Sequence, residues 1–71
     1  MTTHELLAAA RKHAGLSQSK LAEKIGRSQA AVSRHENGVY KVGDDYVKSV
    51  FEACGLPPDW TPPVESESIA A

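Results

Sequence analysis

Residues 17–38, SQSKLAEKIGRSQAAVSRHENG, carry the signals of two short helices joined by a tight turn. Ser17 and Ser28 stand where a serine hydroxyl can accept hydrogen bonds from the first free N–H groups of a helix. Gly26 lies between them, where a residue without a Cβ lets the backbone reverse quickly. The apolar residues of this stretch are spaced so that each helix keeps one face inside: Leu21, Ala22, Ile25 and Val32. The stretch therefore predicts two helices packed together across a glycine turn.

The residues on either side of this stretch predict further helices. Thr2 and Glu5 fit a capping box at the start of a first helix, and Asp44 and Asp45 favour the positive N-terminal end of a later one. The apolar face of that later helix consists of Val47, Val50, Phe51 and Cys54. The expected helices cover about residues 3–14, 18–25, 29–37 and 44–54, so the pattern predicts an all-α domain.

After these helices the chain becomes rich in proline and in acidic residues. Leu56 and Trp60 flank a Pro-Pro-Asp link that can hold one turn of a fifth helix, and the prolines that follow prevent that turn from growing. Residues 61–71, TPPVESESIAA, are polar and acidic, so we expect them to be disordered. The expected architecture is a compact four- to five-helix domain over residues 1–60 with a short acidic tail over residues 61–71.

Positive and negative charges are segregated along the chain. The 71 residues carry a formal net charge of −1, which by itself gives no basic bias. Residues 11–41 nevertheless hold seven Lys or Arg against two Glu, a local excess of +5, whereas residues 49–71 hold four acidic residues and no basic one. A basic segment of this kind suits a polyanionic partner such as nucleic acid. The length allows one small domain.

Other classes of function find little support in the residues. His4, His13 and His35 fit no compact set of metal ligands, and the single Cys54 suits a reducing cytosol. The N-terminus lacks a basic region ahead of an apolar one, and no apolar run approaches the roughly 20 residues of a membrane span. The sequence contains no Ser-His-Asp order, glycine-rich phosphate loop or paired carboxylate site. We therefore expect a cytoplasmic protein that is not an enzyme and has no metal, cofactor or small-molecule ligand.

Residues 7–38, LAAARKHAGLSQSKLAEKIGRSQAAVSRHENG, resemble the phage Cro and repressor type of helix-turn-helix protein, also called the Xre family. The matching family positions are Gln18, Ala22, Gly26, Val32, Glu36, Asn37 and Gly38. The resemblance covers residues 2–60 and implies a five-helix domain that binds double-stranded DNA. It also implies that residues 17–38 are the helix-turn-helix and that the recognition helix, about residues 28–37, enters the major groove.

The resemblance implies roles for individual residues. Those on the outer face of the recognition helix are expected to contact bases: Gln29, Ala30, Ser33 and Arg34. Those that flank the groove are expected to contact phosphates: Gln18, Arg27, Ser28, Asn37 and Lys41. In relatives, the residue at the position of Gln18 also braces the start of the recognition helix. Their chemistry suits these roles, because glutamine pairs with adenine, arginine with guanine, and basic or amide groups with phosphate. Arg11 and Glu36 match a family pair that forms a partly buried salt bridge.

Some residues have alternative interpretations. The polar face around Arg34 is also compatible with a solvated surface that binds no DNA. His35 stands where relatives of this type carry a bulky apolar residue, so we expect a packed histidine rather than a pH sensor. Leu56 and Trp60 can close the core, form a dimer contact, or do both. The last four residues, SIAA, are either a frayed end or a signal for degradation.

Functions of different classes fit these observations. The preferred one is a phage or prophage repressor that binds a pseudo-palindromic operator as a homodimer. The alternative is an antitoxin or protein-interaction module whose acidic tail, residues 61–71, binds a basic protein partner. In a third, the tail mimics or repels nucleic acid and so adjusts the affinity for DNA.

Overall fold

Four α-helices account for the fold of residues 2–63, the part of the chain that the computed structural model describes. The helices are α1 (Thr3–His13), α2 (Gln18–Ile25), α3 (Gln29–Glu36) and α4 (Asp44–Ala53). Each begins where the sequence predicts, and α1, α3 and α4 end one residue earlier because the next residue acts as the C-cap. Of the tail over residues 61–71, for which we expect disorder, residues 64–71 lie outside the described residues, and so do the last four residues with their proposed roles.

Side-chain caps fix the starts of the first three helices. The Ser17 and Ser28 hydroxyls each accept a hydrogen bond of 3.1 Å, from the backbone N–H of Lys20 and of Ala31 respectively. At the start of α1, Thr2 and Glu5 form a reciprocal capping box. These bonds satisfy backbone donors that a helix leaves free at its first turn. The local sequence thus determines where each of these helices begins.

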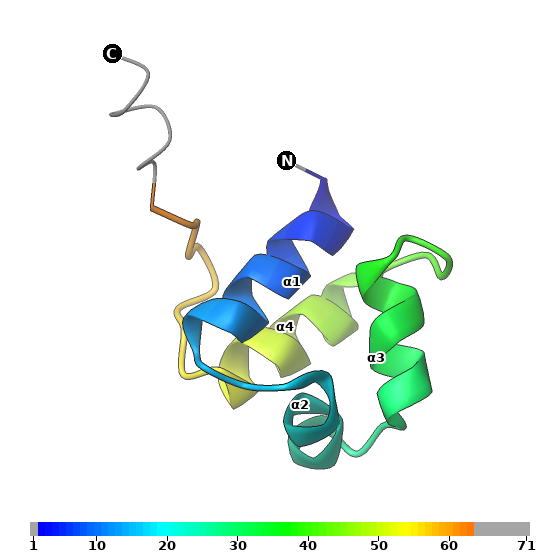
Figure 1. Cartoon of the computed structure of the whole chain (residues 1–71). Helices are drawn as coiled ribbons and strands as arrows, with labels where there is room; N and C mark the ends of the chain where they lie inside the picture. Colours follow the sequence, from blue (N-terminus) through cyan, green and yellow to red (C-terminus); the bar gives the residue numbers. More distant parts are fainter. Residues whose placement is uncertain (1, 64–71) are drawn as a thin grey trace.

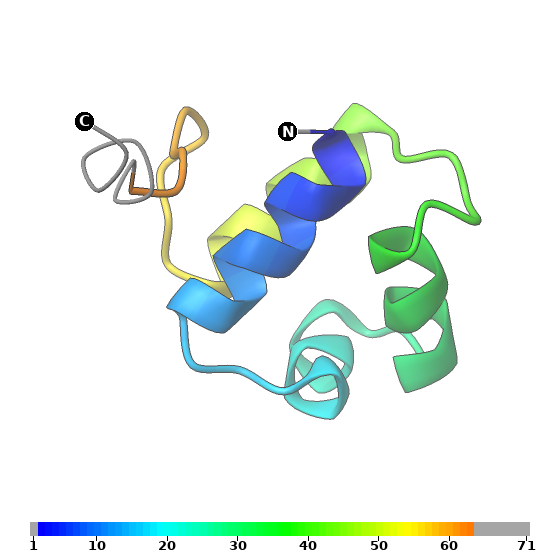
Figure 2. The ribbon, with the colours of Figure 1, turned by 45° about the horizontal axis from the view of Figure 1, so that its top comes forward.

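The helices surround one apolar core. In both views of the ribbon, α1 and α4 lie side by side, and α2 and α3 form the other part of the molecule (Figure 1, Figure 2). The buried side chains come from all four helices: Leu7, Ala10, Leu21, Ala22, Val32, Tyr46, Val50 and Phe51. Because Ala22 is small and buried, α2 can approach its neighbours closely. This core holds α2 and α3 in a fixed relative orientation.

The buried face of α4 differs in part from the one that the sequence predicts. Val50 and Phe51 are buried, but Val47 and Cys54 are only half-buried, and Tyr46 is buried in addition. Tyr46 lies four residues before Val50 and so on the same face of the helix. Its ring also stacks on that of His35 in α3, with centroids 3.9 Å apart. The buried face of α4 thus includes an aromatic contact with α3.

The segment after α4 forms a turn rather than a fifth helix. The Trp60 N–H donates a hydrogen bond of 3.0 Å to the Pro57 carbonyl, and residues 54–63 contain no helical turn. Proline has no N–H to donate, so the prolines here cannot extend a helix. Trp60 packs edge-to-face on Phe51 and lies against His13, which places it, with Leu56, at the edge of the core. The fifth helix that the resemblance implies is therefore absent from the described part of the chain.

Within residues 2–63, none of the helices has the length and apolarity needed to cross a bilayer.

Candidate nucleic-acid interface

The turn between α2 and α3 fixes how these two helices meet. Gly26 ends α2 with φ 71° and ψ 34°, a left-handed conformation that glycine adopts without a steric penalty. Two residues later Ser28 caps α3. Val32 is completely buried, and the side chains of Gln29, Ala30 and Arg34 are exposed. The helix α3 thus packs on the core through the buried Val32 and presents polar side chains on its outer face.

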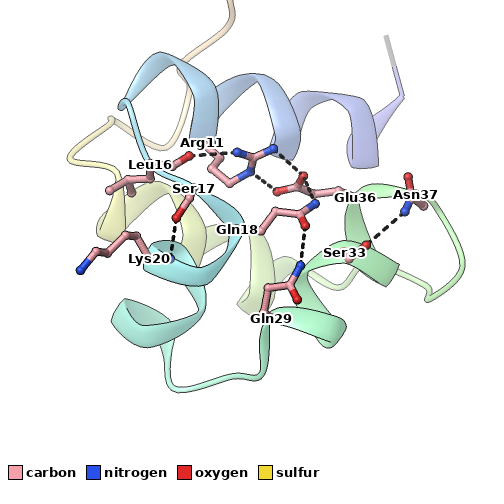
Figure 3. A network of polar contacts seen from close by, with 9 residues as sticks. All are labelled: Arg11, Leu16, Ser17, Gln18, Lys20, Gln29, Ser33, Glu36 and Asn37. Atoms are coloured by element: carbon pink, nitrogen blue, oxygen red, sulfur yellow. Dashed lines mark hydrogen bonds and ion pairs between the residues drawn. The ribbon is translucent and has the colours of Figure 1, made fainter.

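An ion pair ties α1 to the end of α3 (Figure 3). Arg11 donates to both carboxylate oxygens of Glu36, from Nε at 2.7 Å and from Nη2 at 3.0 Å. The Arg11 Nη1 group donates to the Leu16 carbonyl at 2.9 Å, which also holds the loop before α2. The two side chains are only 12% and 6% exposed. This is the pair that the resemblance implies, and its bidentate geometry fixes both partners.

Two glutamines extend this ion pair to the surface. Gln18 Nε2 donates to Glu36 Oε1 at 3.1 Å, and Gln29 Nε2 donates to Gln18 Oε1 at 2.8 Å (Figure 3). A carboxylate only accepts hydrogen bonds, so Gln18 must turn its NH₂ group toward Glu36 and its oxygen toward Gln29. Gln29 must then donate to Gln18, and among residues 2–63 its own Oε1 and its second N–H have no other partner. The interior carboxylate thereby sets the orientation of an exposed amide.

The remaining residues with expected DNA contacts lie around α3. Ser33 and Asn37 pair with each other, since Asn37 Nδ2 donates to Ser33 Oγ at 3.3 Å. Arg27 is exposed in the turn before α3, and Lys41 is exposed in the loop that follows it. The hydroxyl of Ser28 accepts the capping bond, so its own proton remains available as a donor. The helix-turn-helix and its adjoining loop thus carry all nine of these residues.

An aromatic cluster beside α3 is not evident from the sequence pattern. His35 stacks on Tyr46, with rings 23° from parallel, and meets the ring of Tyr40 edge-on at 5.2 Å between centroids. Arg27 lies over Tyr46 and Arg34 over Tyr40, each with Cζ 5.9 Å from the ring centroid. The cluster comes from α3, the loop after it and α4, so no helical periodicity relates its members. The signals in the sequence are the tyrosine and histidine content of residues 35–46 and the position of Tyr46 four residues before Val50.

Two polar atoms of this cluster are buried without a hydrogen-bond partner among the described residues, His35 Nδ1 and Tyr46 Oη. Burial lowers the pKa of the His35 imidazole, and the positive charge of Arg27 lowers it further. Burial likewise raises the pKa of the Tyr46 hydroxyl. Both side chains are therefore held in their neutral forms near neutral pH, as expected for a packed histidine.

A glycine turn between two short capped helices, with the second helix outermost and polar, defines the helix-turn-helix class of DNA-binding proteins. The sequence model of a family described as helix-turn-helix matches residues 7–61. The chain belongs to this family, the Cro/Xre type, whose members are DNA-binding transcription regulators. A comparison with curated proteins finds no match. Across residues 2–63, no group of three or more His, Cys, Asp or Glu side chains is arranged to hold a metal ion.

Proposed function

We propose that this regulator is a repressor, of the kind that phages and prophages encode, which binds a pseudo-palindromic operator as a homodimer. The observation that carries the proposal is the orientation of Gln29, which Gln18 and Glu36 hold from the interior. A side chain held in this way loses less conformational entropy when it binds a base. Occlusion of the promoter would then repress transcription in the cytoplasm of a bacterial host.

The free groups of the α3 side chains suggest which bases are recognised. Gln29 can accept from the N6 amine of adenine through Oε1 and donate to N7 through its second N–H. Arg34 can donate two hydrogen bonds to the O6 and N7 acceptors of guanine, and the Ala30 methyl can contact a thymine methyl. Ser33 can pair with either kind of group. Specificity would therefore arise over a few base pairs facing α3.

Phosphate contacts would come from the surrounding residues. Arg27, in the turn before α3, and Lys41, in the loop after it, supply positive charge, and the side chains of Gln18, Ser28 and Asn37 supply donors. Free backbone N–H groups at the starts of α2 and α3 favour an anion at the same place. About six phosphate contacts would give a slope of about −5 in a plot of log K against log salt concentration.

Two copies of the chain are needed for useful specificity, because one eight-residue helix contacts only a few base pairs. A twofold dimer would place the two α3 helices about 34 Å apart, one turn of DNA. The half-sites would then form an inverted repeat. Leu56 and Trp60 close the core of each monomer, and their exposed edges are candidates for part of the dimer contact.

Selection of bound sequences from random DNA tests the proposal. The expected result is an inverted repeat whose half-sites are spaced by one helical turn. Replacement of Arg34 by Ala should lower affinity by about 1–3 kcal/mol and relax the preference at a single base pair. If the wild-type chain enriches no sequence even at low salt, the proposal is wrong.

The segregation of charge favours one second candidate. Residues 49–71 carry four acidic side chains and no basic one, as suits a segment that binds a basic protein. The chain would then be the antitoxin of a toxin–antitoxin pair whose helical domain still binds DNA. Deletion of residues 62–71 separates the two functions, since a repressor keeps its DNA affinity whereas an antitoxin loses its protein partner.

A further inference from the structure

We propose that Tyr40 is a positioning residue for Arg34, an inference that rests on the proposed function. The Arg34 Cζ atom lies 5.9 Å from the centroid of the Tyr40 ring. A guanidinium within about 6 Å of an aromatic ring is attracted to its face. Tyr40 would hold the Arg34 side chain in the orientation from which it meets a base.

The end of α3 brings Tyr40 back to Arg34. Gly38 has φ 76°, and its N–H donates to the His35 carbonyl at 3.3 Å. The Val39 N–H donates to the Arg34 carbonyl at 2.9 Å. These two bonds form a Schellman motif, which reverses the chain directly after the helix. Tyr40 therefore lies beside the last turn of α3, although it stands six positions after Arg34 in the sequence.

The Tyr40 ring has support on its inner side. The imidazole of His35 meets it at an interplanar angle of 73°, and His35 is itself stacked on the buried ring of Tyr46. Tyr40 remains 44% exposed, so burial in the core does not account for an aromatic residue in this loop. The ring is held by the aromatic cluster, and part of it remains available to Arg34.

The chemistry of arginine allows Arg34 to stack on the Tyr40 ring and to donate to a base at the same time. The flat face of a guanidinium can stack on an aromatic ring while its N–H groups, which lie in the plane, donate to a base. Within residues 2–63 Arg34 forms no ion pair. A free arginine loses considerable rotamer entropy on binding, so a ring that restricts it beforehand favours the bound geometry.

The test compares discrimination at the base pair that Arg34 contacts. Binding constants are measured for the selected operator and for the same operator with that pair changed. Tyr40→Leu keeps apolar bulk but removes the ring, and should reduce discrimination about two- to fivefold. Tyr40→Phe keeps the ring and should preserve the discrimination between the two operators. Val39→Ala is the matched control, because Val39 is an exposed neighbour, at 67%, whose side chain is not part of the cluster.

A double-mutant comparison isolates the action through Arg34. In an Arg34→Ala background, Tyr40→Leu should leave discrimination at this base pair unchanged. Equal weakening on both operators, or a loss with Tyr40→Phe as large as with Tyr40→Leu, would overturn the positioning role. Thermal unfolding of each variant verifies that the fold is retained. If the wild-type chain selects no DNA sequence, the proposed function itself fails. If it selects one but Tyr40→Leu keeps full discrimination, only this inference fails.

Discussion

Gln18 Oε1 accepts a hydrogen bond of 2.8 Å from Gln29 Nε2, so the first residues of α2 and α3 are joined through their amides. Gln18→Ala removes this acceptor and leaves Gln29 free to rotate. We expect a loss of about 1 kcal/mol of preference at the base pair that Gln29 contacts, the typical net value of one neutral hydrogen bond. Competition binding with operators that are changed at that base pair measures the loss of preference. A uniform loss on every operator would mean that Gln18 acts only on phosphate.

Removal of one partner of the Arg11–Glu36 pair should destabilise the fold far more than removal of one partner of a surface pair. Glu36→Ala leaves the guanidinium of Arg11, only 12% exposed, without its carboxylate, and we expect a loss of about 3 kcal/mol in the free energy of unfolding. Glu23→Ala is the matched control, because its pair with Lys20 is 3.7 Å long and about 70% exposed. That variant should change stability by less than about 0.5 kcal/mol. Urea unfolding measures both, and similar losses would contradict the prediction.

Two glycines should respond to serine in opposite directions. Gly43 caps α4 with φ −94° and no side-chain bond, so Gly43→Ser adds a capping hydroxyl and should stabilise the fold by about 0.5 kcal/mol. Gly26 has φ 71°, so Gly26→Ser places a side chain in the left-handed region and should cost about 1–2 kcal/mol. An added Cβ meets nothing within 4 Å at either position. Thermal unfolding compares the two, and a stabilised Gly26→Ser variant would refute the backbone argument.

Acid should destabilise the fold through His35. The pKa of His35 is lowered in the folded chain by burial and by Arg27, so the unfolded chain binds the proton more readily. The contribution of neutral His35 to the free energy of unfolding is therefore complete above about pH 6.5, the ordinary pKa of histidine. It is lost as the pH falls from there through the pKa of His35 in the folded chain. His35→Phe keeps a ring against Tyr46 but cannot titrate. Melting temperatures at pH 7.5 and pH 5.5 should differ less in this variant than in the wild type; an equal difference would exclude His35 as the cause.

Lys41 should contribute to the salt dependence of DNA binding. If it contacts one phosphate, Lys41→Gln reduces the slope of log K against log salt by about 0.9 and weakens binding alike on all sequences. Lys48→Gln is the matched control, because Lys48 lines a shallow apolar groove with Phe51 and Leu56, on α4 and the segment after it. Titrations at several salt concentrations give both slopes. Equal slopes for wild type and Lys41→Gln would mean that Lys41 contacts no phosphate.

Local signals in the sequence were sufficient to predict the helices. Ser17 and Ser28 mark their starts through hydroxyls that cap the backbone, and Gly26 marks a reversal that other residues resist. These effects act over three or four neighbouring residues, so they can be predicted from the sequence alone. The short apolar spacing around Val32 likewise predicts which face of α3 is buried, since this residue is fully inside.

Contacts between distant segments could not be predicted in the same way. Tyr46 lies four residues before Val50, so the helical spacing is compatible with its burial, but this spacing does not predict its stacking on His35. The contact between Tyr40 and His35 joins a loop to a helix and follows no helical spacing. The hydrogen bonds of Gln18 depend on where the core places α1, α2 and α3 relative to one another, so only the resemblance indicated that Gln18 braces the start of α3. The resemblance supplied the Arg11–Glu36 pair and the candidate DNA contacts, but it also implied a fifth helix, which the prolines near Trp60 prevent.

The hydrogen-bonded series from Glu36 through Gln18 to Gln29 restricts how this protein could acquire a new target sequence. Gln18 presents its Oε1 acceptor toward position 29, and its amide cannot flip while Glu36 accepts a hydrogen bond from Nε2. A side chain at position 29 that donates a hydrogen bond is compatible with this arrangement. A carboxylate there would face the Gln18 oxygen and repel it. If residue 29 contacts a base, as proposed, recognition of a base that requires an acidic side chain at this position needs a change of Gln18 in the same step.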